Sequence, residues 1–243
     1  MKKIIILLLC VFSILIGHIA YNISGGVSGL REDIGLEIKA RFNPKLRTIL
    51  NNKDQYPDAM IQSLYRNEEL IDFVYNYPSK KGHVYTNTIG PVTKGRYPLL
   101  LQYDQRWGYG KYGYNVIGMN GCGPTSAAMI IAGLIGRNNI TPFDVASYAY
   151  NHGYYQDGTS WAFFTEGMKH YVIHGRNIPL SYSSMKNEIM NGRPLICSMK
   201  PGDFTTTGHL IVIRGMKQGM FIVNDPNSIK RSNRLWSYDT LSK

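Results

Sequence analysis

Residues 120–136 read Asn-Gly-Cys-Gly-Pro-Thr-Ser-Ala-Ala-Met-Ile-Ile-Ala-Gly-Leu-Ile-Gly. Gly123, Pro124 and Thr125 predict the start of a helix, because proline fits the first helical turn without losing a hydrogen bond. Gly136 predicts its end. The apolar run between them is typical of a helix buried at the centre of a domain. Cys122 is therefore expected at the amino-terminal end of a buried helix.

The chain around this stretch changes character along its length. After Pro98 it is rich in glycine and tyrosine, and short helical patterns are followed by strand-like runs. Helices that precede an antiparallel sheet predict an α+β fold. Further helices are expected at Pro142–His152, Ser160–Tyr171 and Met185–Met190, and strands at Leu195–Met199, His209–Arg214 and Met220–Val223, with a hairpin at 216–219.

The residues before Pro98 indicate two further parts of the chain. Residues 23–30 resemble a flexible linker, and the apolar spacing from Arg31 to Tyr77 is helical, with starts at Asn43-Pro44 and Tyr56-Pro57-Asp58. We therefore divide the chain into residues 1–22, a linker with a helical extension over 23–96, and a main domain over 97–243. The extension could be a propeptide-like inhibitor, a spacer or a cap on the domain.

Residues 1–22 have the pattern of an export signal. Lys2 and Lys3 precede an apolar run from Ile4 to Ile16, which Cys10 and Ser13 interrupt. Thirteen positions are short for a spanning helix of roughly 20 residues, and an extension to Ile23 reaches that length. The segment is predicted to be either a cleaved signal peptide or an uncleaved membrane anchor. Either way, the main domain would lie outside the cytoplasm.

Composition excludes several classes of protein. The chain is 44% hydrophobic and 18% charged, as globular proteins are. Three cysteines are too few for a disulfide-stapled scaffold. The net charge of +11 is spread out, and no run of Lys and Arg exceeds two residues. That pattern argues against a nucleic-acid partner and favours attraction to an anionic envelope.

Cys122 has the setting of a reactive thiol. The unpaired N–H groups and the dipole at a helix start lower the pKa of a thiol, and the thiolate is the reactive form. Glycines on both sides would let a substrate backbone approach closely. Taken alone, the same pattern fits a structural cysteine at a helix cap equally well.

His209 and Asp225 complete a possible catalytic set. His209 follows Thr205-Thr206-Thr207-Gly208 and begins a strand, so it is expected at a cleft edge. Asp225 ends the next strand and could orient the imidazole, while Asn224 would alternate to the opposite face. Each residue also has an ordinary interpretation, His209 as a surface or core histidine and Asp225 as part of a turn.

Four segments together resemble one known family. Gly121–Ser126, Gly208–Val212, Asn224–Pro226 and Leu101–Gly108 are similar to motifs of the C39-like peptidases, a branch of the papain-like cysteine peptidases. The resemblance covers roughly residues 97–240. It implies a papain-like fold, in which a helical part packs against an antiparallel sheet, and a triad of Cys122, His209 and Asp225.

The resemblance also implies that Gln102 stabilises an oxyanion. In family members with a closely spaced glutamine, that residue lies a few positions before the cysteine. Here Gln102 precedes it by twenty positions, and Gln105 competes for the role. The backbone N–H of Cys122 is the safer oxyanion donor, because a helix start supplies it in any case.

Neither a metal nor a cofactor is expected. His152, His170 and His174 lie near predicted helices, and we do not expect them to bind a metal. Cys197, in Leu-Ile-Cys-Ser-Met, is expected to be a buried strand residue and not a catalytic one. The alternative, a bridge to Cys122, would abolish activity.

The predicted function is that of an extracytoplasmic, membrane-anchored or secreted thiol hydrolase that cleaves peptide or amide bonds. Its partners would be a peptide or a cell-wall peptide and, through residues 1–22, a membrane. The sequence leaves the oligomeric state open. A peptidoglycan-directed hydrolase of the same chemistry and a non-catalytic binding module with this fold are the alternatives.

Overall fold

The computed structural model describes residues 34–243. The predicted signal or anchor over residues 1–22 and the linker up to residue 30 lie outside the described residues. From residue 34 onward, no helix combines the length and the apolar character needed to cross a bilayer. The chain divides into two compact units, one that ends at Tyr75 and one that covers Asn76–Lys243.

The described part of the first unit is helical, as its apolar spacing predicted. Helices α2 (Pro44–Asn51) and α3 (Asp58–Leu64) begin where the sequence places them. The Asn43 side chain caps α2 by accepting a hydrogen bond from the N–H of Leu46, 3.1 Å away. The fully buried side chains of this unit include Leu46, Ile49, Met60, Leu64 and Val74. Helix α4 (Ile71–Lys80) begins in this unit and ends in the second.

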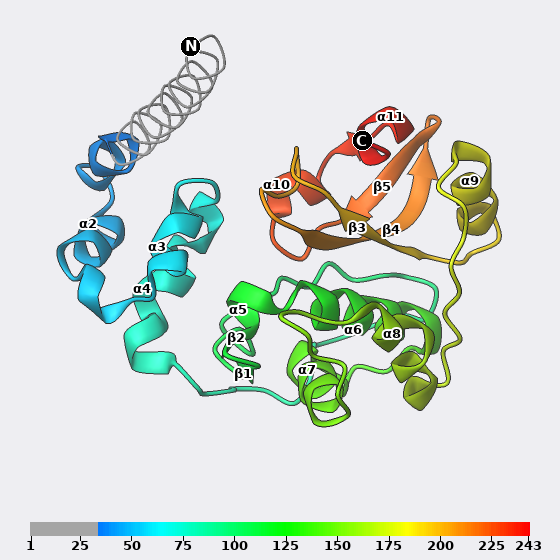
Figure 1. Ribbon diagram of the computed structural model, residues 1–243, viewed down its shortest axis with the longest axis horizontal. Helices are drawn as coiled ribbons and strands as arrows, with labels where there is room; N and C mark the ends of the chain where they lie inside the picture. Colours follow the sequence, from blue (N-terminus) through cyan, green and yellow to red (C-terminus); the bar gives the residue numbers. More distant parts are fainter. Residues whose placement is uncertain (1–33) are drawn as a thin grey trace, which may run out of the picture. The chain divides into compact units, whose positions relative to one another are not determined.

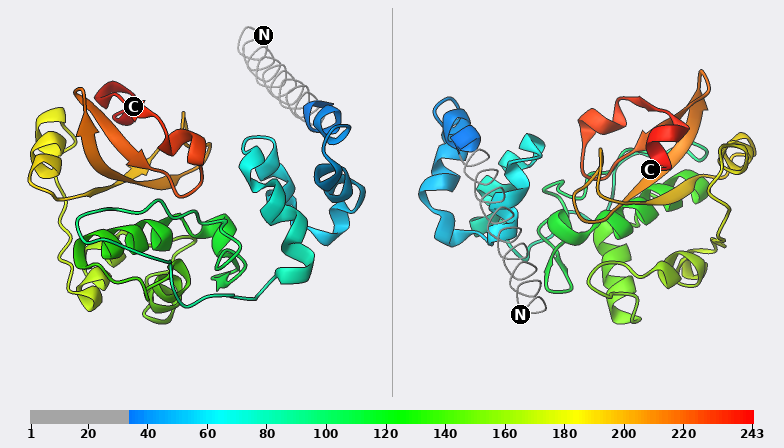
Figure 2. Two further views of the ribbon diagram at one scale, coloured as in Figure 1. Left: turned by 180° about the vertical axis from the view of Figure 1, so that it is seen from behind. Right: turned by 45° about the horizontal axis from the view of Figure 1, so that its top comes forward.

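The second unit has an α+β architecture, which confirms the predicted class. An antiparallel sheet has the order β3 (Leu195–Met199), β4 (His209–Lys217), β5 (Met220–Asn224) and β6 (Leu235–Trp236). The long helix α6 (Cys122–Ile135) packs against one face of this sheet, as Figures 1 and 2 show from different sides. The remaining elements are α5 (Ile117–Asn120), α7 (Pro142–Asn151), α8 (Trp161–Thr165), η3 (Gly167–Tyr171), α9 (Tyr182–Met190), α10 (Ile229–Ser232), α11 (Tyr238–Leu241) and the hairpin β1 (Lys111–Tyr112) and β2 (Asn115–Val116).

Strand β4 lies between two hydrophobic clusters. Leu210 and Val212 belong to the cluster around α6, whereas Ile211 and Ile213 belong to the cluster with α9 and α11. This division follows from the two-residue period of a strand, which sends alternate side chains to opposite faces. Because both faces are covered there, the strand is apolar without interruption over residues 210–213.

Two sequence expectations differ from the structure. The single helix expected at Ser160–Tyr171 is split into α8 and the 3₁₀ helix η3, and Glu166 separates them. Strand β6 and the β1–β2 hairpin, each of two-residue strands, were not expected. Strands this short carry too few residues for a period to be visible.

Residues 76–96 associate with the second unit. The N–H of Tyr85 donates to the carbonyl of Arg106 at 2.8 Å, and the N–H of Gly95 donates to the carbonyl of Gly133 at 2.7 Å. The boundary at residue 97 thus stays a prediction from composition, while contacts group residues from Asn76 onward with the sheet and α6.

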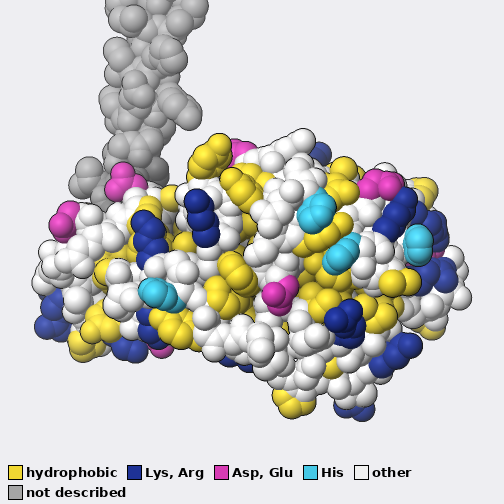
Figure 3. Space-filling view, turned by 90° about the horizontal axis from the view of Figure 1, so that it is seen from below, with side chains coloured by type: hydrophobic (Ala, Val, Ile, Leu, Met, Phe, Trp, Pro, Cys, Tyr) yellow, Lys and Arg dark blue, Asp and Glu magenta, His cyan; other side chains and the backbone are white. Residues whose placement is uncertain are grey.

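The surface carries scattered basic groups. On the face shown in Figure 3, Lys and Arg side chains are dispersed among uncharged ones and form no continuous stripe over the described residues. This distribution agrees with the spread of charge along the sequence.

Candidate active site

Cys122 is the first residue of α6, where the sequence predicted a thiol at a helix start. Its side chain keeps partial exposure and hydrogen-bonds to His209. Burial by itself raises the pKa of the thiol. The hydrogen bond and charge of His209, together with backbone hydrogen bonds of Leu210 and Gly123, outweigh burial and leave the pKa below its ordinary value. The thiolate is thus stabilised within the fold.

His209 is the first residue of β4 and is 8% exposed. Its Nε2 atom lies 2.7 Å from Oδ1 of Asp225, which leaves Nδ1 for the thiol of Cys122. Burial opposes the charged imidazolium. The hydrogen bonds and charges of Asp225 and Cys122 favour it more strongly, and they raise the pKa of His209 to about 9. The lowered pKa of Cys122 and the raised pKa of His209 both shift the pair towards thiolate and imidazolium.

Asp225 follows β5 directly and is fully buried. Its Oδ1 atom also accepts the backbone N–H of Asn227 at 2.7 Å, and its backbone N–H donates to Oγ of Ser232 at 2.8 Å. Burial raises the pKa of the carboxyl, but the bonds and charges of His209 and Arg231 hold it below its usual value. The carboxylate is thus fixed in both position and charge.

Arg231 is a site residue that the sequence interpretation missed. Its Nε donates to Oδ2 of Asp225 at 2.5 Å, so the carboxylate bridges an imidazole and a guanidinium. Arg231 lies on the one-turn helix α10, which Ser228 caps through a bond to the Arg231 N–H. A cation six positions after the aspartate, with a capping serine between them, is the signal that could have revealed it.

Asn224 lies on the opposite side of β5 from the carboxylate, as strand alternation predicted. Its Nδ2 donates to the carbonyls of Tyr97 and Pro98 at 3.2 and 3.0 Å, and its Oδ1 accepts from Arg214. Asn224 therefore ties the start of the domain to the sheet, and Asp225 alone faces the imidazole.

Gln102 lies behind the start of α6. Its backbone N–H donates to the carbonyl of Pro226 at 2.7 Å, and its Nε2 donates to the carbonyls of Gly118 and Met119 at 3.0 and 3.4 Å. Both amide hydrogens are committed to the backbone in this arrangement, and the buried Oε1 has no partner. The role of Gln102 as an oxyanion donor stays a prediction. Gln105 instead accepts from Asn76 and Lys80.

The glycines beside Cys122 serve internal packing rather than substrate access. A Cβ at Gly123 would lie 2.2 Å from Oγ1 of Thr159, and one at Gly121 would lie 2.5 Å from the carbonyl of Ile117. The sequence interpretation, which left the space above these glycines to a substrate, is wrong for this reason. Thr159 also hydrogen-bonds to the hydroxyl of Tyr112 at 2.7 Å.

Cys197 contrasts with Cys122. Both thiols are free, and the Cys197 thiol lies in β3 where burial raises its pKa to about 12. It is therefore uncharged at neutral pH and unsuited to nucleophilic attack. From residue 34 onward, no three His, Cys, Asp or Glu side chains gather as a metal site would require.

The fold and the site together define an α+β protein in which a helix-start thiol, a strand-start imidazole and a buried carboxylate are hydrogen-bonded in series. The model of the Peptidase_C39 like family matches residues 94–243, more than half of the chain. The chain belongs to this family, which is one of cysteine peptidase-type hydrolases. Comparison with curated proteins found no match, and comparison with solved structures found none either.

Proposed function

We propose that this chain is a peptidase that cleaves peptide or amide bonds through Cys122, His209 and Asp225. The observation that carries the proposal is the hydrogen-bonded series from the Cys122 thiol through His209 to the buried Asp225. A structural cysteine at a helix cap has no need of a buried imidazole and carboxylate behind it. The lowered pKa of Cys122 and the raised pKa of His209 are those of a nucleophile with its acid–base partner.

The reaction would proceed in two halves. The thiolate of Cys122 attacks the carbonyl carbon, and His209 donates its proton to the nitrogen as the C–N bond breaks, which releases an amine and leaves a thioester. A water molecule then attacks the thioester and gives a proton to His209. The C–S bond breaks, so that a carboxylic acid leaves and the thiolate returns.

The negative oxygen of each tetrahedral intermediate needs hydrogen-bond donors. The first N–H groups of a helix have no acceptor within the helix, and Cys122 is the first residue of α6. The backbone N–H of Cys122 is thus the proposed donor. Gln102 would join it only by releasing the carbonyls of Gly118 or Met119.

The test is a thiol-directed probe. The full chain is incubated with a peptidyl electrophile at pH 7, and the labelled residue is mapped by mass spectrometry. We expect adducts at Cys122 and none at Cys197, and we expect Cys122→Ala to abolish both labelling and peptide cleavage, whereas Cys197→Ala leaves them within about twofold. A folded chain that gives no adduct at Cys122 refutes the proposal.

We place the enzyme outside the cytoplasm, secreted or anchored through residues 1–22, with a peptide or cell-wall peptide as substrate. The supports are the lysines and apolar run of residues 1–22 and the net charge of +11. Degradation of the chain by protease added to intact cells would support this location, and full protection until the cells are lysed would contradict it. A comparison of the rates at which the enzyme digests purified cell wall and free peptides distinguishes the two candidate substrates.

A further inference from the structure

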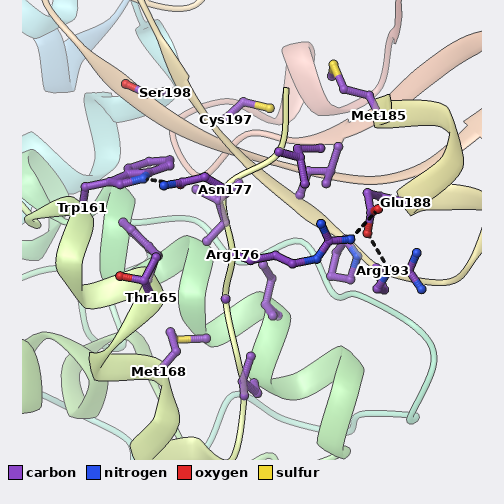
Figure 4. A pocket seen from close by; sticks show the side chains of 18 of the residues that line it. Trp161, Thr165, Met168, Arg176, Asn177, Met185, Glu188, Arg193, Cys197 and Ser198 are labelled. Carbon is purple, nitrogen blue, oxygen red and sulfur yellow. Dashed lines mark hydrogen bonds and ion pairs between the residues drawn. The ribbon is translucent and has the colours of Figure 1, made fainter. Parts of the chain in front are cut away.

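A cavity of about 420 Å³ lies between the helical part of the second unit and β3. Its size is within the range of small-ligand and substrate sites. Figure 4 shows the segment of Arg176 and Asn177 crossing it, with Trp161 and Thr165 on one side and Met185 and Glu188 on the other. The side chain of Trp161 donates to Oδ1 of Asn177 at 2.8 Å, which ties this segment to α8.

The cavity reaches β3 near the point where β3 pairs with the start of β4. Ser198 lines the cavity there and is the cross-strand partner of Leu210, whose backbone bonds the Cys122 thiol. Trp161 lines it too, two positions after Thr159, the residue that packs against the bare face of Gly123. Two elements that line the cavity, β3 and the start of α8, therefore neighbour residues that contact Cys122 or Gly123.

The middle of the cavity is apolar. Phe164 and Met168 reach it from the helices, and Ile178 reaches it from the crossing segment. Cys197 contributes an uncharged thiol there. The further apolar residues of the wall include Ile130, Leu134, Ile173, Leu195 and Ile196. A bulky hydrophobic side chain would lose its contact with water on such a surface.

The far end of the cavity is cationic. Glu188 is 7% exposed and pairs with two guanidinium groups, Nη2 of Arg176 at 2.7 Å and Nε of Arg193 at 2.5 Å. The hydrogen bond of Arg193, opposed by burial and helped by Arg176, lowers the pKa of Glu188 and keeps it ionised. Two positive charges against one negative leave an excess of one positive charge, and both guanidinium groups are more than half exposed.

We propose that this cavity selects peptide substrates with a bulky apolar residue within two positions of the cleaved bond and an acidic residue about three positions further out. The spacing follows from β3, which lines the cavity from Ser198 to Leu195, three residues or about 10 Å at the rise of a strand, and Arg193 lies two positions before Leu195. An extended peptide advances by the same rise, so its acidic side chain would reach Arg176 and Arg193. The inference rests on the proposed function, since the peptide must present its bond to Cys122.

The test uses quenched-fluorescence peptides and the full chain. Matched peptides carry Leu or Asp at the inner position, near the cleaved bond, and Glu or Lys at the outer position, three residues further out. The pair of positions is moved along the peptide one residue at a time, on both sides of the cleaved bond. We expect the Leu–Glu peptide to have a kcat/KM at least tenfold above the Asp–Glu and Leu–Lys peptides. Equal rates for all three would overturn the proposal.

Two variants assign the effect to the cavity. Arg176→Gln leaves Glu188 paired with Arg193, and we expect it to reduce the preference for Glu over Lys about tenfold, mainly through KM. Ile178→Ser should reduce the preference for Leu over Asp in the same way. Arg96→Gln is the control, because Arg96 is exposed and does not line the cavity. Retained preferences in both cavity variants would overturn the assignment.

A binding measurement separates this inference from the proposed function. The Leu–Glu peptide is titrated into Cys122→Ala and into the double variant that also carries Arg176→Gln. Binding that the second change weakens, with no cleavage by the unaltered chain, would retain the cavity and refute the peptidase. Cleavage by the unaltered chain, with no selective binding in Cys122→Ala, would retain the peptidase and refute the cavity.

Discussion

Replacement of Asp225 by asparagine tests the whole hydrogen-bonded series. The carboxylate is fully buried. One of its oxygens accepts a hydrogen bond from Nε2 of His209 at 2.7 Å, and the other accepts one from Nε of Arg231 at 2.5 Å. An amide of the same size keeps the volume, but it removes the negative charge and replaces one acceptor with a donor. The imidazolium of His209 would then lose the partner that stabilises it.

The size of the effect follows from that one bond. A hydrogen bond to a charged group contributes about 1.5–3 kcal/mol. Loss of this bond lowers the equilibrium constant for thiolate–imidazolium over thiol–imidazole by roughly 10- to 150-fold. The same loss lowers the pKa of His209 from its value of about 9.

Alkylation by iodoacetamide measures this shift without a known substrate. The rate of Cys122 modification is followed by mass spectrometry between pH 5 and pH 9 in the full chain. At pH 6–7 we expect Asp225→Asn to react more slowly than the unaltered chain, with the roughly 10- to 150-fold shift of the equilibrium as the upper limit of the decrease, because the rate follows the fraction of thiolate. Asp239→Asn, a change at an exposed aspartate of α11, is the matched control.

Cys197 provides a second control inside the same molecule, because its pKa of about 12 predicts almost no reaction in this range. If Asp225→Asn is folded by circular dichroism and Cys122 still reacts at the unaltered rate throughout, the carboxylate has no influence on the thiol. The reasoning from Asp225 through His209 to Cys122 would then be wrong. Faster labelling of Cys197 than of Cys122 would refute it as well.

Three further predictions concern stability. Arg231→Met removes one cation from a buried carboxylate and should lower the free energy of unfolding at pH 7 by about 3 kcal/mol, measured by urea unfolding. Gly123→Ala places a Cβ 2.2 Å from Oγ1 of Thr159 and should cost about 1–3 kcal/mol in the same assay. In Cys122→Ala the hydrogen bond and charge of Asp225 still favour the imidazolium against burial, whereas those of Cys122 are lost, so the stabilisation from His209 is complete below about pH 6.5 and is lost as the pH rises through the folded-state pKa. In the unaltered chain the lowered pKa of Cys122 adds stability as the pH rises, so any fall above pH 6.5 should be smaller than in Cys122→Ala.

These predictions have their own controls. Gly208→Ala adds a Cβ to open space and should leave unfolding unchanged, whereas a loss equal to that of Gly123→Ala would point to a general cost of removing glycine. Arg231→Lys should recover part of the lost stability, because it restores a cation without the guanidinium geometry. A Cys122→Ala variant whose stability does not fall above pH 6.5 would contradict the part that Asp225 has in raising the pKa of His209.

Much of the fold was readable from local patterns. The predicted strand Leu195–Met199 has those bounds in the structure, because an apolar run between Gly192 and Pro201 leaves little choice of ends. Helix α6 ends at Gly136, whose φ of 72° is easy for glycine alone. The split within Ser160–Tyr171 was not readable, because the break depends on the packing of Gly167 against Phe163 and Tyr154.

The candidate site was readable in part. Cys122, His209 and Asp225 stood out because each lies at the end of a regular element, where side chains can converge. Arg231 did not stand out, because its role depends on the return of the chain after β5 to place α10 against the carboxylate. The contacts of Gln102 could not be predicted from its spacing to Cys122, because its backbone N–H donates to the carbonyl of Pro226, which is far away in the chain.

The sequence by itself determined the elements, since helix starts, strand periods and turns are local consequences of residue type. It also determined the family, because the motifs stand in a fixed order. Only the tertiary structure decided which side chains share a proton and which charge offsets another. Hydrogen bonds and pKa values depend on distances of a few ångströms between residues such as Cys122 and His209, which are 87 positions apart in the chain and meet only when α6 packs on β4.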